Sequence, residues 1–132
     1  ILMNGDYILD SNIVIDLFRK DQVTIEKIRS LKSVYIPAIV LGELYYGANK
    51  SSQTAKRIQE VEALKVRVVI LDVTEVTAKH YGEMKNQLRQ KGKPIPENDI
   101  WIAAIAKETN LPLLSNDIHF SEVDGISVEK LK

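Results

Sequence analysis

The sequence predicts an α/β fold: a single domain with a parallel sheet of about five strands and helices on both faces of that sheet. Two observations predict it. Short apolar runs alternate with longer segments of helical periodicity along the 132 residues, a pattern typical of parallel sheets. No internal repeat, low-complexity tract or Gly/Ser-rich linker divides the chain, so we expect one domain over residues 1–132 with its core over about 7–128.

The predicted strands are short apolar runs. In chain order they are Tyr7–Leu9, Val34–Ile36, Val68–Leu71, Leu113–Leu114 and Ile126–Val128. Ligands of such folds bind beyond the carboxyl ends of the strands. Polar residues directly after the first and fourth of these strands are therefore candidates for a common site.

The predicted helices fill the segments between the strands: Ser11–Arg19, Val23–Leu31, Pro37–Ala48, Ser51–Leu64, Thr74–Lys91 and Asn98–Thr109. Pro37 suits the first turn of its helix. Thr74 can cap the longest helix, which we expect to stop at Gly92. Pro94 and Pro96 keep the next segment extended. The last helix is apolar nearly all round, so it must be largely buried.

The composition excludes several classes of protein. No apolar run approaches the ~20 residues needed to cross a bilayer, and no basic stretch followed by an apolar one opens the chain. There is no cysteine, which excludes disulfides, thiol nucleophiles and thiolate metal sites and agrees with a cytoplasmic protein. The only histidines are His80 and His119, so a zinc site of several imidazoles is excluded. We interpret His119 as a surface or packing residue.

Charge and the start of the chain give two further expectations. Lys and Arg total 18 and Asp and Glu total 18, so no overall positive field attracts nucleic acid, and any such attraction must be local. Met3 is a candidate natural start, in which case Ile1 and Leu2 are added residues.

Four acidic residues are candidates for a functional site. Asp10 directly follows the first predicted strand, and Asp117 lies just past the fourth. Asp99 lies in the first turn of its helix, and Glu43 is the one charge in an apolar helix. Taken singly, capping, turn formation and the helix dipole explain the three aspartates. Glu43 needs a partner, because burying an unpaired carboxylate costs several kcal/mol, and that partner is either a basic side chain or a metal ion.

Taken together, the four carboxylates suit a hard divalent cation. Without a cation they would repel one another and some would stay protonated. The residue pattern leaves open whether they converge. It also leaves open an aspartyl-phosphate enzyme, although Asn12 stands where that chemistry wants a second acid. A receiver domain phosphorylated at Asp72 is a further alternative, although Ser11 breaks the pair of acids it would need.

Four segments carry a resemblance to a known family. They are Leu9-Asp10-Ser11-Asn12 with Ile15 and Leu17, then Gly42–Gly47, then Asn98–Ala104, then Leu114–Asp117 followed by Phe120. In this order the segments resemble the motifs of PIN-domain nucleases, and most closely those of VapC-type toxins of prokaryotic toxin–antitoxin pairs. The resemblance extends from Tyr7 to about Val128.

The resemblance implies a metal-dependent endoribonuclease that hydrolyses RNA phosphodiester bonds with Mg²⁺ or Mn²⁺. It implies that the catalytic and metal-binding residues are Asp10, Glu43, Asp99 and Asp117. It assigns Asn12 and Ser115 to hydrogen bonds that orient these acids. The family often has threonine where Ser11 and Ser115 stand, and serine keeps the hydroxyl. A non-catalytic PIN-like binding module is the alternative, although it would be expected to lack some of the acids.

The resemblance also implies partners: an RNA substrate, a VapB-type antitoxin whose tail occupies the acidic groove, and a second copy in a homodimer, with no membrane. Apolar segments at 39–46 and 58–64 could serve these contacts or belong to the core. The candidate RNA-binding residues are Arg89, Lys91 and Lys93, together with Lys79 and Lys85. Acidic residues interleave with them, so a plain solvated helix face remains the alternative.

Overall fold

The computed structural model describes residues 5–132, so the predictions for Ile1, Leu2 and Met3 lie outside the described residues. Within that part of the chain, five parallel strands form one sheet in the order β3-β2-β1-β4-β5. They are β1 (Asp6–Leu9), β2 (Ser33–Pro37), β3 (Val69–Leu71), β4 (Leu113–Leu114) and β5 (Val128–Glu129). The predicted α/β class and parallel sheet are confirmed.

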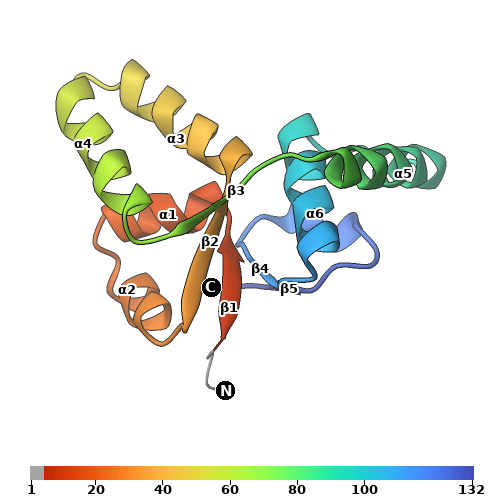
Figure 1. Cartoon of the computed structure of the whole chain (residues 1–132), viewed down its shortest axis with the longest axis horizontal. Helices are drawn as coiled ribbons and strands as arrows, with labels where there is room; N and C mark the ends of the chain where they lie inside the picture. Colours follow the sequence, from red (N-terminus) through yellow and green to blue (C-terminus); the bar gives the residue numbers. More distant parts are fainter. Residues whose placement is uncertain (1–4) are drawn as a thin grey trace.

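The helices are α1 (Ser11–Phe18), α2 (Gln22–Arg29), α3 (Ala38–Lys50), α4 (Thr54–Lys65), α5 (Glu75–Lys91), α6 (Glu97–Thr109) and the short 3₁₀ helix η1 (Ile118–Glu122). In Figure 1, α1, α2 and α4 lie to the left of the strands, and α5 and α6 lie to the right. Both faces of the sheet are thus covered, as parallel sheets require. Along residues 5–132, no helix has the length and apolar character needed to cross a bilayer.

Several element boundaries differ from the predictions by one to three residues, and the differences at α3, α4 and the last strand have identifiable causes. Pro37 ends β2, where it pairs with Leu71, and its ψ of 144° keeps it outside the first turn of α3. Ser51 has a ψ of 149°, which ends α3 and delays the start of α4 to Thr54. The strand expected at 126–128 forms at Val128–Glu129 instead, because Glu129 is the residue that pairs with Leu114.

The long helix α5 begins and ends as its sequence predicts. The Thr74 side chain accepts a hydrogen bond from the Thr77 main-chain nitrogen, and Thr77 bonds back to Thr74 in a capping box. Gly92 follows the helix with φ of 71°, a left-handed conformation that glycine adopts without steric cost.

The order of the strands sets the position of the site. The chain proceeds from β1 outward to β2 and β3, and then returns to place β4 on the other side of β1. The strand order therefore reverses between β1 and β4, and the carboxyl ends at such a reversal form the crevice in which α/β sheets bind ligands. Helix α6 packs into the core beside this point, with Ile102, Ala103 and Ile105 fully buried. Its burial confirms the prediction made from its all-round apolar surface.

Candidate active site

Asp10 is held rigidly at the carboxyl end of β1. Its residue is only 2% exposed. The Oδ1 atom accepts a hydrogen bond from the main-chain nitrogen of Ser11 at 2.8 Å, which caps α1. The Oδ2 atom accepts from the Ser115 hydroxyl at 2.7 Å and from Asn12 Nδ2 at 3.1 Å. Three donors thus fix the carboxylate, and it keeps lone pairs for a further partner.

Ser115 and Asn12 join the loop after β1 to the loop after β4. The buried Ser115 hydroxyl accepts from the Asp117 main-chain nitrogen at 3.0 Å while it donates to Asp10. Asn12 Oδ1 accepts from the main-chain nitrogen of Asn116 at 3.3 Å. These bonds connect the Asp10 carboxylate to the segment that carries Asp117.

Asn116 is a supporting residue that the sequence did not single out. Its Oδ1 atom accepts from the main-chain nitrogens of Leu131 and Lys132 at 2.8 and 2.9 Å. The side chain therefore ties the loop after β4 to the segment that follows β5. An asparagine in a Ser-Asn-Asp turn is too common for its sequence context to reveal this link.

Asp99, Asp117 and His119 meet around one nitrogen atom. His119 Nδ1 lies 3.0 Å from Asp99 Oδ2 and 2.9 Å from Asp117 Oδ1. His119, which we interpreted as a surface or packing residue, has a side chain that is 42% exposed, and its ring also contacts these two acids. The cause is η1, whose first turn brings residue 119 back toward Asp117, and the sequence gives little signal for so short a helix.

The acids interact electrostatically with one another. Burial, reinforced by the charge of Asp117, raises the pKa of Asp99 to about 6. Burial also raises the pKa of Asp10, although its hydrogen bond from Ser115 opposes the rise. Burial again raises the pKa of Glu43, and the charges of Asp10 and Asp117 add to it. The structure therefore places the four predicted acids so close together that the charges of Asp10 and Asp117 help to raise the pKa values of Asp99 and Glu43.

Glu43 lies on α3, which passes close to the start of α6. Its Oε2 atom accepts a long hydrogen bond, 3.5 Å from Asn98 Nδ2, and a hydrogen bond from the Ser11 side chain also lowers the Glu43 pKa. Its Oε1 atom is buried without a hydrogen-bond partner. No Lys or Arg among residues 5–132 forms an ion pair with Glu43. The basic partner that would have explained this buried carboxylate is thus absent from the described residues, and the orphaned oxygen suits a cation.

The donor set fits a divalent cation. Ligand atoms of Asp99, Asp117 and His119 all lie within 4.8 Å of one another. Carboxylate oxygens are the ligands that Mg²⁺ and Mn²⁺ accept in proteins. Asp10 lies outside this closest group, and its charge contributes to the raised pKa of Asp99.

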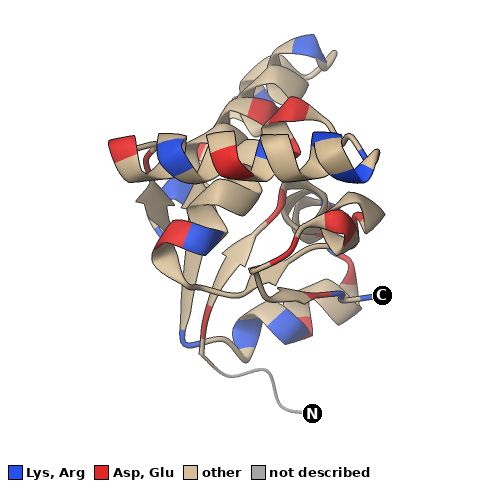
Figure 2. Ribbon diagram, turned by 90° about the vertical axis from the view of Figure 1, so that its right-hand side faces the viewer, with Lys and Arg blue, Asp and Glu red and all other residues tan. Residues whose placement is uncertain are grey.

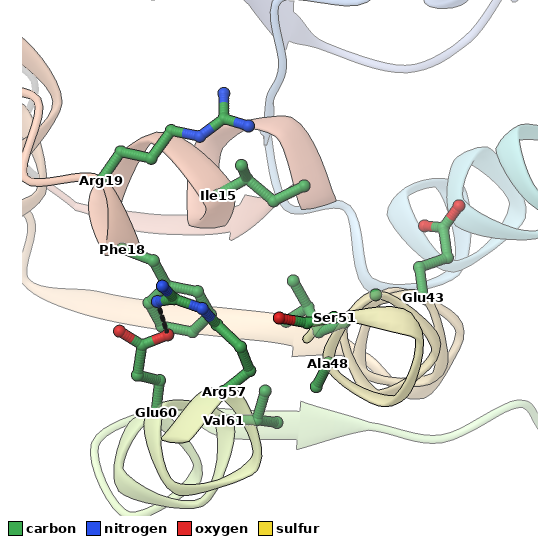
Figure 3. A pocket seen from close by; sticks show the side chains of 11 residues that line it. Ile15, Phe18, Arg19, Glu43, Ala48, Ser51, Arg57, Glu60 and Val61 are labelled. Atoms are coloured by element: carbon green, nitrogen blue, oxygen red, sulfur yellow. Dashed lines mark hydrogen bonds and ion pairs between the residues drawn. The ribbon is translucent and has the colours of Figure 1, made fainter. Parts of the chain in front are cut away.

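A cavity of about 420 Å³ opens beside the acids, between α1, α3 and α4. Its apolar wall is formed by Ile15, Phe18, Leu44, Ala48 and Val61. Figure 3 shows these helices presenting side chains toward the cavity, with Glu43 at one edge. Arg19 also lines the cavity, and Arg57 forms an ion pair with Glu60 at 2.8 Å. Glu43 is the one member of the acidic group that also lines this cavity.

The predicted basic surface lies along α5 and the turn after it. Lys85 is paired with Glu97 at 3.0 Å, and Lys91 donates to the last carbonyl oxygen of η1 at 2.7 Å. Figure 2 shows acidic and basic residues interleaved on this helix, which crosses the front of the view. Arg89 and Lys93 are exposed. The role of these residues in RNA binding stays a prediction.

Replacing Ser115 with alanine should lower the free energy of unfolding by about 1–3 kcal/mol, because it leaves a buried Asp10 oxygen without its shortest hydrogen bond. Urea unfolding of the metal-free protein at neutral pH measures the loss. Ser115→Thr keeps the hydroxyl and is the matched control. Equal stability of the alanine variant and the wild type would contradict the assigned role of this hydroxyl.

The chain is similar to known nucleases over almost its whole length. The PIN domain family model matches residues 7–126. A ribonuclease VapC2 from Haemophilus influenzae is 36% identical over 126 residues, which cover 93% of this chain and 96% of that protein. A tRNA(fMet)-specific endonuclease VapC from Salmonella typhimurium is 30% identical with the same coverage. The crystal structure of DNA-bound VapBC from Salmonella typhimurium matches with a TM-score of 0.90 at 28% identity, over 96% of this chain and 98% of that chain.

Proposed function

The chain belongs to the PIN domain family, and we propose that it is a metal-dependent endoribonuclease that hydrolyses RNA phosphodiester bonds. Its site would consist of Asp10, Glu43, Asp99 and Asp117 with Mg²⁺ or Mn²⁺, in one domain spanning the chain. The observation that carries the proposal is the meeting of these acids at the point where the strand order reverses. The ribonuclease names of relatives at 30% and 36% identity support the same activity.

A bound divalent cation would offset the charge of the scissile phosphate and lower the pKa of the attacking water. The residues of the chain then have distinct tasks. Asn12 and Ser115 hold the Asp10 carboxylate in one orientation. Glu43 Oε1 has no hydrogen-bond partner, and burial raises the Glu43 pKa, so this oxygen is suited to accept the proton of the attacking water.

Cleavage of a mixed pool of structured RNAs tests the proposal. The purified chain is incubated with Mg²⁺, Mn²⁺ or EDTA, and the pool includes tRNA because the Salmonella relative is named for tRNA(fMet). We expect discrete fragments with either metal and none with EDTA. Cleavage that persists in EDTA would contradict the metal requirement. No cleavage by folded protein in either metal would favour a binding role for this fold.

We propose that the natural partners are a VapB-type antitoxin and a second copy of this chain. The match to a VapBC complex supports the first partner, and the apolar cavity next to Glu43 offers a place for part of it. Exposed apolar residues such as Val66 and Val69 leave surface for the second partner. Light scattering should give the mass of a dimer at micromolar concentration, and a monomer there would contradict the homodimer.

Reversing two exposed charges at the end of α5 should weaken RNA binding. The double variant Arg89→Glu, Lys93→Glu changes two exposed basic residues of this surface, whereas Lys85 and Lys91 are held by Glu97 and by the Glu122 carbonyl oxygen. RNA affinity should fall about tenfold, and the slope of log affinity against log salt should fall by about one for each RNA phosphate that is no longer neutralised.

The matched control places the same charge change on α2, with Lys27→Glu and Arg29→Glu, away from the strand ends that carry the acids. Filter binding of a non-cleaved RNA at several salt concentrations gives both quantities. Equal RNA affinity of the two double variants would rule out a specific contribution of Arg89 and Lys93.

A further inference from the structure

The imidazole of His119 faces two carboxylates through a single nitrogen atom. Asp99 Oδ2 and Asp117 Oδ1 lie 3.0 and 2.9 Å from Nδ1. One N–H hydrogen can point well at only one acceptor, so a hydrogen bond accounts for one of these contacts. A positive charge would account for both, carried either by a protonated imidazole or by a cation between the three atoms.

The spacing also matches the shell of a divalent cation. In an octahedral shell with ligands about 2.1 Å from the ion, neighbouring ligand atoms lie about 3.0 Å apart. The two measured separations from Nδ1 to oxygen have this length. One oxygen from each acid and one nitrogen from His119 can therefore act as neighbouring ligands without a change of fold.

The main chain holds His119 in this position. The His119 main-chain nitrogen donates to the same Asp117 Oδ1 atom at 2.9 Å, and Asp117 caps η1 through this bond. Phe120, the next residue, is 1% exposed and anchors η1 in the core. The ring is thus placed by the backbone rather than by a flexible surface loop.

We propose that His119 is a ligand of the divalent cation, through Nδ1, beside Asp99 and Asp117. The inference rests on the proposed function for the presence of a cation, and it adds a nitrogen ligand to a site otherwise made of carboxylates. Imidazole favours first-row transition metals, whereas carboxylates alone suit Mg²⁺. His119 therefore biases the site toward Mn²⁺ over Mg²⁺.

Pulsed electron paramagnetic resonance of bound Mn²⁺ tests this ligand directly. The chain has only two histidines, so untagged protein gives an unambiguous assignment. We expect ¹⁴N coupling in the wild type and in the control His80→Gln, whose ring lies beside Glu83 on α5. The coupling should disappear in His119→Gln. The wild-type spectrum is itself a test, and it does not depend on the folding of any variant.

Calorimetric titration gives the second readout. His119→Gln should weaken Mn²⁺ binding about tenfold or more and change Mg²⁺ binding by less than about threefold. Bound Mn²⁺ without nitrogen coupling in the wild type, or an equal loss for both metals, would overturn the proposed ligand. Neither result depends on RNA cleavage, so an inactive protein with a nitrogen-coupled Mn²⁺ would contradict the nuclease alone. Absence of Mn²⁺ binding would overturn both the ligand and the metal site.

Discussion

Replacing Asp99 with asparagine is expected to reduce metal-dependent RNA cleavage by about a thousandfold or more while making the metal-free protein more stable. Asp99 is 8% exposed and lies within ligand distance of Asp117 and His119. A cation contributes several kcal/mol to stabilising the transition state, and about 4 kcal/mol corresponds to a thousandfold in rate. Asparagine keeps the shape of the side chain and removes the charge that a cation needs.

Single-turnover cleavage in Mn²⁺ measures the first effect, and thermal unfolding in EDTA measures the second. An exposed acid outside the site, Asp72 after β3, provides the control variant Asp72→Asn. The control should cleave RNA like the wild type and should melt within a degree or two of it. An Asp99→Asn variant that keeps cleavage within tenfold of the wild type would remove Asp99 from the proposed machinery.

The Asp72→Asn control also tests an alternative that the sequence left open, in which the chain is a receiver domain phosphorylated at Asp72. Asp72 is exposed beyond β3, which is one of the two edge strands of the sheet. The acids with raised pKa values lie instead around the reversal between β1 and β4. Asn12, which stands where an aspartyl-phosphate enzyme wants a second acid, donates to Asp10. Neither phosphorylation chemistry has its second acid in place.

The fold could be predicted because periodicity and burial agree along most of the chain. Helix α6 is apolar nearly all round and is buried nearly all round. The errors fall at boundaries, where short-range preferences compete. Pro37 has the φ of −61° that suits both a strand end and a first helical turn, and its pairing with Leu71 selects the strand. A strand partner of this kind cannot be read from local sequence.

Half of the site could also be predicted, for a topological reason. Asp10 and Asp117 follow predicted parallel strands, so the fold class places both on one rim of the sheet. Only the structure shows that the two strands, β1 and β4, are neighbours. Asp99 and Glu43 come from helices, and no local pattern fixes where those helices cross. The resemblance to a known family supplied their assignment. Neither the fold class nor the family resemblance identified His119. Its ring is positioned by a 3₁₀ turn, which leaves no strand or helix periodicity in the sequence.

Glu43 shows where sequence reasoning reaches its limit. Its apolar surroundings showed that the carboxylate needs a partner, but they left a basic residue and a metal ion equally open. Among the described residues, the structure excludes a basic partner for Glu43. The buried Oε1 atom has no hydrogen-bond partner, and no Lys or Arg side chain pairs with the carboxylate. A cation next to Asp10 and Asp117 would also offset the charges that raise the pKa of Glu43.

The stability of the metal-free protein should fall between about pH 4 and pH 6, relative to that of Asp99→Asn. The pKa of Asp99 rises from 3.8 to about 6 on folding, mainly through burial. The folded state therefore binds more protons than the unfolded state in this window, and stability decreases as pH increases. A rise of this size lowers the free energy of unfolding by about 3 kcal/mol, because each tenfold change in the acid dissociation constant corresponds to about 1.4 kcal/mol. The full loss is reached above about pH 6. Because Asp99 is nearly buried, solvent screens little of this cost.

Urea unfolding of wild type and Asp99→Asn in EDTA at pH 4 and pH 7 measures the effect as a difference, which cancels the acids that do not interact with Asp99. The advantage of the variant should grow by up to about 3 kcal/mol between the two pH values. Mn²⁺ at a hundred times its dissociation constant should stabilise the wild type by about 2.7 kcal/mol at pH 7. Its effect should nearly vanish at pH 4, where protons compete for the carboxylates. A wild type that gains stability over Asp99→Asn as pH rises in EDTA would show that Asp99 is satisfied without a cation, and it would contradict a metal at this position.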